Sequence, residues 1–300
     1  MIDVLEIIKN SGAKVKEGFL LSSMTSFRVG GKADYVAEPV SKDSAVSLIN
    51  ALRQNNIEYI ILGNGTNVLA GDKGYRGVVV VFGEGMGDVE IEGNTISAGA
   101  GALLSKTANA ACEAGLSGLE FAAGIPGSVG GACIMNAGAY GGEIKDVIVS
   151  ADVLKSDGSV VTLCKDEFEL RYRGSSFSDD GDIVLGAKFV LENDDPKEIR
   201  QRIEELARKR REKQPLNLPS AGSTFKRPKD NFAGKLIQDA GLMGKAIGGA
   251  AVSDKHAGFI VNTGGATAAD VKALIDYVKD AVYEQSGIML EPEVRYIGEF

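Results

Sequence analysis

The sequence predicts an α+β protein with a two-lobed region followed by a smaller carboxy-terminal domain. Strands and helices alternate early in the chain, probable hairpins dominate its middle, and glycine-rich turns interrupt the strands. The 300 residues are enough for two domains with substantial cores. We expect an amino-terminal helical segment (1–23), a first lobe (24–76), a second lobe (77–193), a connecting helix (194–212) and the final domain (213–300).

The first lobe is predicted from a helix that lies between two strands. MIDVLEIIKNSG (1–12) has the apolar spacing of a short amphipathic helix, and its acidic residues do not fit a secretory signal. Ser41 can cap a helix over 41–57, and YIILGNGTNVL (59–69) is a buried strand that runs into a glycine turn. This β–α–β order indicates a small α/β lobe.

The second lobe is predicted to be rich in hairpins. Gly93-Asn94 and Asp157-Gly158 each separate two strand-like runs, which is typical of a tight turn. The predicted strands cover 77–83, 89–101, 147–163 and 182–192, and one helix covers 102–116.

The last third of the chain is predicted to contain three helices and a closing strand. Residues 194–215 form an amphipathic helix that Pro215 ends, and we interpret its charge run as a solvated face. Thr267 and Asp270 form a capping pair, and Gly287 is a suitable terminator for the helix between them. The remaining elements are a helix at 231–242 and a strand at 288–298.

The composition excludes several classes of partner. A hydrophobic content of 44%, a charged content of 25% and a net charge of −8 argue against a nucleic-acid or membrane-surface protein. No apolar segment is long enough to enter a membrane. The three cysteines (Cys112, Cys133 and Cys164) fit buried, reduced thiols of a cytoplasmic protein.

Metal binding is not expected, because the chain has only one histidine. For this residue, His256, we favour a packing role over a chemical one.

The run GIPGSVGGACIMNAGAYGGE (124–143) contains seven glycines and no charge before its last residue. Ordered glycine costs roughly 0.5–1 kcal/mol relative to alanine, so the run needs a physical reason. A membrane span does not fit its proline and asparagine, and a flexible linker does not fit its packing residues. The run therefore predicts a bend where backbone amides approach an anionic ligand.

A second candidate turn is Gly63-Asn64-Gly65-Thr66-Asn67. It has Val68 where a dinucleotide fingerprint of the Rossmann type needs a third glycine, and the chain contains no P-loop. Each turn alone is more often structural than phosphate-binding. Two such turns in one chain favour a long ligand with a central pyrophosphate.

A set of motifs resembles the UDP-N-acetylenolpyruvoylglucosamine reductase family, in its shorter form that lacks a tyrosine-bearing insertion. Besides the turn at 63–67, the motifs are GIPGSVGG (124–131), NAGAYG (136–141), YRGSSF (172–177), AGSTFKRP (221–228) and LEPEVR (290–295). They occur in the right order from Thr25 to Gly298. The resemblance implies an FAD-binding domain of the vanillyl-alcohol-oxidase (PCMH) type in two lobes, joined to an α+β substrate-binding domain.

The same resemblance implies non-covalent FAD, NADPH as reductant and a reaction in peptidoglycan precursor synthesis. The enolpyruvyl group of UDP-N-acetylglucosamine enolpyruvate would be reduced to give UDP-N-acetylmuramate. The residues that would contact FAD are Gly63, Asn64, Gly65, Thr66, Asn67, Gly124, Ile125, Pro126, Gly127, Ser128, Gly130, Gly131, Asn136, Gly138 and Ala139.

By resemblance, three residues carry the chemistry. Arg173 and Glu293 would lie at the substrate carboxylate, and Ser223 would give a proton to the α-carbon of the enolate. One well-placed donor to such an anion lowers a barrier by roughly 2.7–4 kcal/mol. Glu293 could help only if it is protonated or bound to a donor, because a bare carboxylate would repel the charge. Lys226, Gln238 and Arg295 are the expected substrate contacts.

Alternatives remain open at this stage. Taken singly, Arg173 could be a surface arginine, Ser223 a turn residue, and Glu293 with Arg295 an ion pair on one strand face. A flavin-dependent alcohol oxidase of the same fold, or a non-catalytic flavin-binding module, would keep the glycine turns without needing Ser223. Phe177 is followed at once by SDDGD and the next strand, so the sequence leaves open how the substrate site closes.

Overall fold

The computed structural model describes residues 3–300, which fall into two compact units that are interleaved along the chain. Unit 1 contains the residues up to Glu17, Tyr35–Asn64 and Gly77–Arg210. Unit 2 contains Gly18–Asp34, Gly65–Arg76 and Arg211–Phe300. The first glycine turn is therefore divided between the two units, after Asn64.

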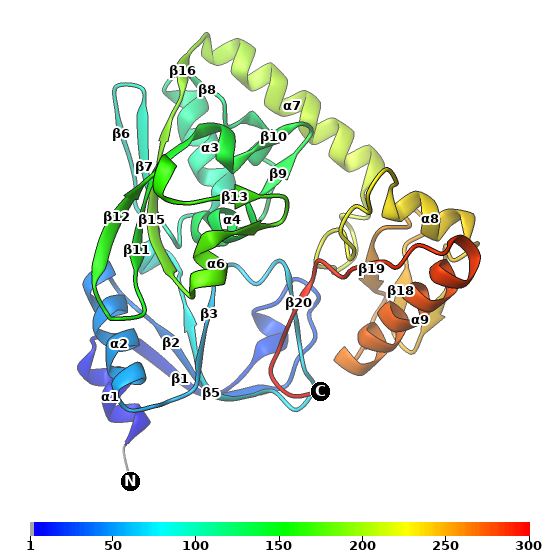
Figure 1. The fold of residues 1–300 in the computed structure, drawn as a ribbon, viewed down its shortest axis with the longest axis horizontal. Coiled ribbons are helices and arrows are strands. Elements are labelled where there is room, and N and C mark those ends of the chain that lie inside the picture. Colours follow the sequence, from blue (N-terminus) through cyan, green and yellow to red (C-terminus); the bar gives the residue numbers. More distant parts are fainter. Residues whose placement is uncertain (1–2) are drawn as a thin grey trace. The chain divides into compact units, whose positions relative to one another are not determined.

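A four-stranded sheet with the order β1-β2-β5-β3 contains the predicted β–α–β arrangement (Figure 1). Strands β3 and β5 are parallel, and the side chain of Ser41 accepts a hydrogen bond from the Ser44 amide at 3.2 Å, which confirms the predicted cap. The elements are α1 (Val4–Asn10), β1 (Lys14–Leu20), β2 (Lys32–Glu38), α2 (Lys42–Gln54), β3 (Tyr59–Leu62) and β5 (Tyr75–Val81).

Residues 14–20 form strand β1, whereas we expected helical structure up to residue 23. Helix α1 ends at Asn10, and Gly12 follows with a φ of 77°. Within β1 only Val15 and Phe19 are partly buried and the remaining residues are exposed. This sparse apolar pattern cannot supply the continuous face that a longer helix would need. A single 3₁₀ turn, η1 (Leu21–Ser23), follows the strand.

The second sheet of unit 1 has five antiparallel strands in the order β12-β11-β15-β7-β6. Both predicted hairpins are confirmed, since β6 pairs with β7 across Gly93-Asn94 and β11 pairs with β12 across the turn that holds Asp157-Gly158. The strands are β6 (Val89–Glu92), β7 (Thr95–Gly99), β11 (Ile148–Leu154), β12 (Val160–Cys164) and β15 (Ile183–Val190).

Helices α3 (Leu104–Glu113) and α4 (Val129–Met135) supply apolar side chains to the core on one face of this sheet. Ile96 and Val153 of the sheet lie in the same cluster, fully buried. On the other face, Leu154 and Leu185 belong to a cluster with the apolar side of α2. Each fully buried aliphatic side chain contributes about 1.5–3 kcal/mol, so burial on both faces stabilises the sheet.

Short elements connect these layers of unit 1. Strands β8 and β16 pair with each other, as do β9 and β10, and β13 and β14. They are β8 (Leu116–Ser117), β16 (Glu192–Asn193), β9 (Gly138–Ala139), β10 (Gly142–Glu143), β13 (Leu170–Arg171) and β14 (Gly174–Ser175). The short helices are η2 (Glu84–Met86), η3 (Glu120–Ala122), α5 (Ile144–Val147), η4 (Lys165–Glu167) and α6 (Ser176–Asp180).

The predicted connecting helix is α7 (Pro196–Lys213), which begins at a proline, as first helical positions often do. Ile199 and Ile203 bury its apolar side against Cys112. Among the cysteines, Cys112 and Cys133 are buried as expected, but Cys164 is exposed at the end of an outer strand.

Unit 2 packs two helices against a small antiparallel sheet with the order β17-β18-β19. The capping box between Thr267 and Asp270 is confirmed, and Gly287 ends the long helix with a φ of 69°. A separate parallel pair joins β4 to β20. The elements are β4 (Val68–Ala70), α8 (Ala233–Asp239), β17 (Ala246–Ile247), β18 (Ala250–Val252), β19 (Ile260–Asn262), α9 (Ala268–Ser286) and β20 (Arg295–Ile297).

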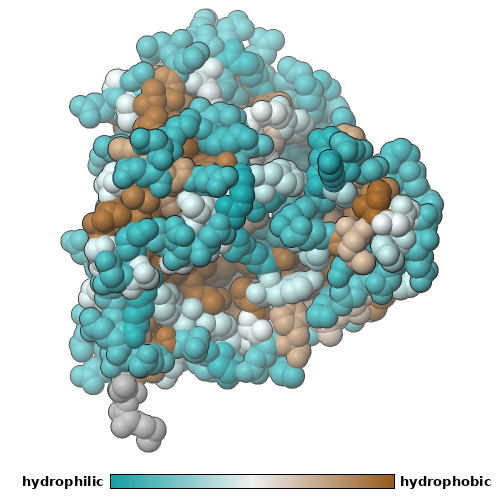
Figure 2. Space-filling model, in the orientation of Figure 1, coloured by the Kyte–Doolittle hydropathy of each residue, from teal (hydrophilic) through white to brown (hydrophobic). Residues whose placement is uncertain are grey.

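The surface in view is mostly hydrophilic, with smaller hydrophobic patches between the polar side chains (Figure 2). Over residues 3–300, no helix combines the length and the apolar character that crossing a bilayer requires.

The start of α9 has a second cap that the sequence did not reveal. The two carboxylate oxygens of Asp72 accept hydrogen bonds from the amides of Ala268 and Ala269 at 2.8 and 2.9 Å. These are two of the amides that a helix leaves without an internal partner, and the charge also interacts favourably with the helix dipole.

We therefore expect Asp72→Ala to lower the free energy of unfolding by about 1–2 kcal/mol. Urea denaturation measures the change. Asp280→Ala, at an exposed position in the middle of α9, is the matched control and should change stability by less than about 0.5 kcal/mol. Equal effects of the two substitutions would contradict the capping role.

Candidate functional site

Gly63 and Asn64 of the first glycine-rich turn lie beside the second run in unit 1, although they are far apart in sequence. Asn64 Nδ2 donates a hydrogen bond to the carbonyl oxygen of Pro126 at 2.6 Å. A Cβ atom added to Gly63 would overlap Ser128 Oγ, so the two chain segments touch where glycine permits it. This part of the first predicted cradle therefore contacts the second.

The first turn presents a row of backbone amides. The carbonyls of Gly65 and Thr66 accept hydrogen bonds from the amide and hydroxyl of Ser26 at 3.0 and 3.3 Å. Within residues 3–300, no acceptor is bonded to the amides of Asn64, Gly65 or Thr66. Consecutive amides without a partner in a turn form an anion-binding nest, so this segment fits a ligand phosphate.

Gly65 is required for this turn on two grounds. Its φ of 61° is in the left-handed region, and an added Cβ would overlap the carbonyl oxygen of Met24.

Several glycines of the second run are explained by close packing of the protein, whereas we expected them to let backbone amides approach a ligand. An added Cβ would lie 2.9 Å from the Ala100 Cβ at Gly130, and 2.6 Å from the Phe121 ring at Gly142. These glycines let protein segments pack closely against each other. The run also buries Cys133, and burial raises the pKa of that thiol to about 12, which makes it unreactive.

Asn136 shapes the second run with its side chain. Its Nδ2 donates to Glu143 Oε2 at 2.7 Å and to the carbonyl of Arg171 at 3.3 Å, while its Oδ1 accepts from the amide of Lys145 at 3.0 Å. It is buried and left-handed, with a φ of 41°, at the end of α4. Its predicted contact with FAD remains a prediction, because the side chain already serves the loop.

Arg173 lies at the tip of a hairpin that is fastened to this run. Strands β13 and β14 flank it, and Ser175 Oγ donates to the carbonyl of Ile134 at 2.9 Å. Its own φ is 55°, and its guanidinium lies 5.4 Å from the centre of the Tyr172 ring. The hairpin that carries Arg173 is therefore held in unit 1, and the role of the guanidinium remains a prediction.

The charge of Arg173 also acts on Glu143. A hydrogen bond from Lys145 does most to lower the pKa of Glu143; burial opposes it, while Asn136 and the positive charges of Lys145 and Arg173 add to the lowering.

In unit 2, the segments that carry Ser223 and Glu293 run side by side. The Glu293 amide donates to the carbonyl of Thr224 at 2.8 Å, and the Lys226 amide donates to the carbonyl of Glu291, also at 2.8 Å. A β-bridge joins Phe225 to Pro292 between these bonds. The AGSTFKRP and LEPEVR motifs therefore form one local structure.

Thr224, which was not among the predicted site residues, anchors this local structure in the interior of unit 2. Its side chain is fully buried, its amide donates to the Gly258 carbonyl at 2.8 Å, and its Oγ1 accepts from the Ile260 amide at 3.0 Å. Ser223 beside it is exposed, and its role as a proton donor remains a prediction.

The expected substrate contacts differ in their surroundings. The Lys226 ammonium forms an ion pair with the Glu291 carboxylate. Arg295 is exposed, and its amide donates to the carbonyl of Asn67 at 3.0 Å. Gln238 is exposed near the end of α8, and its substrate contact remains a prediction.

His256 has the surroundings of a packing residue. Its Nδ1 accepts a hydrogen bond from the Gly258 amide at 3.1 Å, and its ring meets the edge of Phe259 at a centroid distance of 5.0 Å. Burial lowers its pKa, so the ring stays neutral at pH 7.

Comparison with known proteins agrees with this geometry. A family model described as an FAD binding domain matches residues 33–164, and one described as the UDP-N-acetylenolpyruvoylglucosamine reductase C-terminal domain matches residues 214–297. The UDP-N-acetylenolpyruvoylglucosamine reductase of Agathobacter rectalis is 53% identical over 289 residues, which are 92% of this chain and 91% of the relative. The chain belongs to the UDP-N-acetylenolpyruvoylglucosamine reductase family.

Solved structures extend the match to the fold. The crystal structure of UDP-N-acetylenolpyruvylglucosamine reductase from Thermus caldophilus has a TM-score of 0.82 at 35% identity, over 95% of this chain and 99% of that one. Phl p 4.0202, a glucose dehydrogenase, has a TM-score of 0.50 at 15% identity over 65% of this chain and 45% of that one, which shows a likeness of fold alone. The α+β fold with an FAD-binding domain of the vanillyl-alcohol-oxidase type is thus confirmed.

Arg210 lies close to the 124–143 run, and the sequence did not show that this charged residue is partly buried. Arg210 belongs to a charge run that we interpreted as a solvated face, yet burial lowers the pKa of its guanidinium. Its Nη1 lies 3.2 Å from where a Cβ of Gly124 would be. Helical spacing places this residue on the inner side of α7, which a charge run alone does not reveal.

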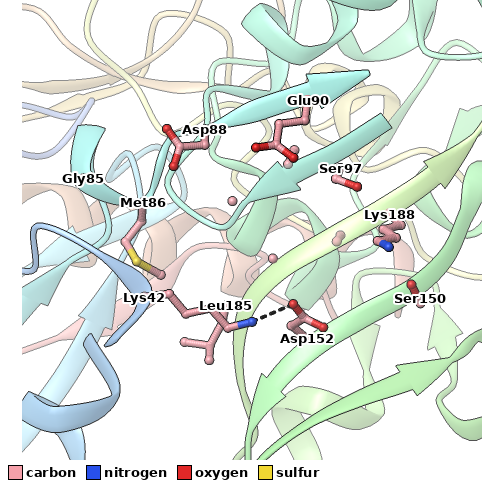
Figure 3. A pocket seen from close by; sticks show the side chains of 14 residues that line it. Lys42, Gly85, Met86, Asp88, Glu90, Ser97, Ser150, Asp152, Leu185 and Lys188 are labelled. Carbon is pink, nitrogen blue, oxygen red and sulfur yellow. Dashed lines mark hydrogen bonds and ion pairs between the residues drawn. The ribbon is translucent and has the colours of Figure 1, made fainter. Parts of the chain in front are cut away.

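A separate hollow of about 290 Å³ in unit 1 includes none of the predicted site residues (Figure 3). Lys42 and Asp152, which both line the hollow, form an ion pair at 2.7 Å. Burial acts to raise the pKa of Asp152, but hydrogen bonds from Lys42 and Thr162 outweigh it and leave that pKa lowered. The hollow lies on the five-stranded sheet, among small and charged side chains such as Ser97, Glu90 and Lys188.

The contact between the two turns can be tested by substitution. Gly63→Ala places a methyl group on Ser128 Oγ and should separate the turns, so we expect FAD to dissociate at least tenfold more readily. Fluorescence titration of the apoprotein with FAD measures this change. Gly83→Ala is the control, because an added Cβ there meets nothing within 4 Å. Unchanged FAD affinity in Gly63→Ala would contradict the proposed cradle.

The single histidine predicts a simple effect of pH on stability. Since burial in the folded state lowers the pKa of His256 below its ordinary value, the unfolded chain takes up the proton first as the pH falls. We expect the free energy of unfolding to decrease from about pH 7 to about pH 5.5, by at most about 1.4 kcal/mol per pH unit. Urea denaturation at several pH values measures the slope, and His256→Gln should reduce it. An equal slope in both proteins would contradict this account.

Proposed function

We propose that this protein is an FAD-dependent reductase that uses NADPH to convert UDP-N-acetylglucosamine enolpyruvate to UDP-N-acetylmuramate for peptidoglycan precursor synthesis. The observation that carries the proposal is the joining of the AGSTFKRP and LEPEVR segments by hydrogen bonds from the Glu293 and Lys226 amides. It is supported by the fit of the 64–66 amides to a phosphate and by the named relatives. Three cysteines without a disulfide are consistent with the cytoplasm as its location.

The chemistry that bound FAD supplies is the transfer of a hydride from NADPH to the methylene carbon of the enolpyruvyl group. The amides of residues 64–66 would hold a phosphate of the cofactor. Lys226 and Arg295 would bind the anionic groups of the sugar nucleotide, together with Gln238. Lys226 forms an ion pair with Glu291, so this pair must break before Lys226 can bind the substrate.

The remaining task of the chain is to stabilise negative charge on the substrate and to deliver one proton. We assign Arg173 to the substrate carboxylate, where a fixed guanidinium neutralises the developing enolate without reorganisation. We assign Ser223 to the proton transfer, with its hydroxyl donating to the α-carbon. Glu293 would lie at the same carboxylate, and it lowers the barrier only when it carries or shares a proton.

The alternative of an alcohol oxidase has less support. Such enzymes often attach flavin through a histidine, and the only histidine of this chain is half-buried beside Phe259 in unit 2. An oxidase also has no need for a proton donor such as Ser223. A non-catalytic flavin-binding module would not need it either.

The decisive substitution is Ser223→Ala. Since the hydroxyl acts only after hydride transfer to the substrate, NADPH should reduce the flavin at the normal rate. Reoxidation by the enolpyruvyl nucleotide should slow by about 10²–10⁴-fold. Anaerobic stopped-flow absorbance of the flavin measures both steps.

Ser220→Ala is the matched control, since this serine lies three positions earlier in the same segment. Normal reoxidation in Ser223→Ala, or slower reduction by NADPH, would refute the assignment of the serine. If the wild-type protein binds no FAD, or if the enolpyruvyl nucleotide never reoxidises it, the proposed function itself is wrong.

A further inference from the structure

We propose that Asn67, the last residue of the first glycine turn, is a positioning residue that holds Glu293 in place for the reduction of the substrate. This inference rests on the proposed function, because it assigns Glu293 to the substrate carboxylate. It differs from the predicted role of Asn67, which was contact with FAD.

Both backbone polar groups of Glu293 are fixed by residues of other motifs. Its amide donates to the carbonyl of Thr224 at 2.8 Å, and its carbonyl accepts a hydrogen bond from Asn67 Nδ2 at 3.2 Å. A residue whose main chain is held on both sides has little freedom to translate or rotate. The direction of the Glu293 side chain therefore depends on the Asn67 amide group.

Asn67 also binds Arg295, which begins strand β20 two residues after Glu293. Its carbonyl accepts a hydrogen bond from the Arg295 amide at 3.0 Å, and the parallel pairing of β4 with β20 continues from there, with Val68 opposite Arg295. Asn67 therefore holds the main chain at Glu293 through its side chain and at Arg295 through its own carbonyl. All these residues belong to unit 2.

The first turn thus contains two asparagines with different partners. Asn64 donates to the Pro126 carbonyl in unit 1, where it joins the two glycine-rich turns. Asn67 donates to the carbonyl of Glu293 in unit 2, just before strand β20.

The energetics predict an effect on rate rather than on folding. One side-chain hydrogen bond to a backbone carbonyl contributes only a small part of the stability of a folded protein. A catalytic group displaced by about 1 Å can slow a reaction roughly 100-fold. Loss of the Asn67 donor should therefore leave the fold intact while it slows the step in which Glu293 acts.

The test is Asn67→Ala in the flavin-loaded enzyme with excess FAD. We expect reoxidation by the enolpyruvyl nucleotide to slow by about 10- to 100-fold, with reduction by NADPH changed less than about threefold. Gln285→Ala is the matched control, because Gln285 also donates its side-chain amide to a backbone carbonyl of unit 2, that of Asp239 at 3.0 Å. This control should reoxidise at the wild-type rate.

A double-mutant cycle separates positioning from general damage. In a Glu293→Ala background the position of the carboxyl group no longer matters, so adding Asn67→Ala should cost less than about threefold. If Asn67 supported the enzyme in some other way, its removal would cost the same factor in both backgrounds.

Hydrogen exchange gives a readout that does not depend on activity. Asn67→Ala keeps the main-chain carbonyl that accepts from Arg295 but loses the side-chain donor to the Glu293 carbonyl. The amides of residues 293–297 should therefore exchange faster in Asn67→Ala, and they should not do so in Asn64→Ala. Should Asn67→Ala prove too unstable, Asn67→Asp keeps the volume while it loses the donor, and it must show the same slowed reoxidation.

Two results would overturn the inference while the proposed function stands. One is normal reoxidation of flavin-loaded Asn67→Ala by the enolpyruvyl nucleotide. The other is an equal loss in the wild-type and Glu293→Ala backgrounds, which would leave Asn67 as a cofactor contact only. Failure of the wild-type protein to reoxidise would instead reject the proposed function.

Discussion

The close contact between the Gly63–Asn64 turn and the Pro126–Ser128 segment is the constraint on which the proposed cofactor site depends. A side chain at Gly63 would separate these segments, and the cradle would then lose one wall. The same requirement recurs through the second run, where Gly130 and Gly142 lie against Ala100 and Phe121. The entropy that these glycines cost is offset by packing that only a bare backbone allows.

A second set of contacts holds the main chain around Ser223 and Glu293. The Thr224 carbonyl accepts a hydrogen bond from the Glu293 amide, and the Asn67 side chain donates one to the Glu293 carbonyl, so the main chain at Glu293 is held on both sides. Thr224 is buried for this purpose, while Ser223 next to it is exposed. Because the buried Thr224 holds the main chain, the neighbouring Ser223 could face the proposed substrate without a loss of rigidity.

Local signals in the sequence predicted the local parts of this structure. The Ser41 cap, the Thr267–Asp270 capping box and the turns of both hairpins each depend on residues within a few positions, and all are confirmed. What the sequence could not show are contacts between distant segments. The cap that Asp72 provides for α9 and the buried position of Arg210 are of this kind, because no local spacing distinguishes them from solvated charges.

The net charge of the protein bears on how it could bind anionic ligands. The chain carries a net charge of −8, yet the proposed cofactor and substrate are both anionic. Backbone amides at 64–66 supply positive potential without any charged side chain, which leaves the cations for the substrate. Lys226 is held by Glu291, whereas no carboxylate of residues 3–300 lies within ion-pair distance of the partly buried Arg210. A paired lysine can exchange its partner for a transient ligand, while a desolvated arginine without a carboxylate suits an anion that stays bound.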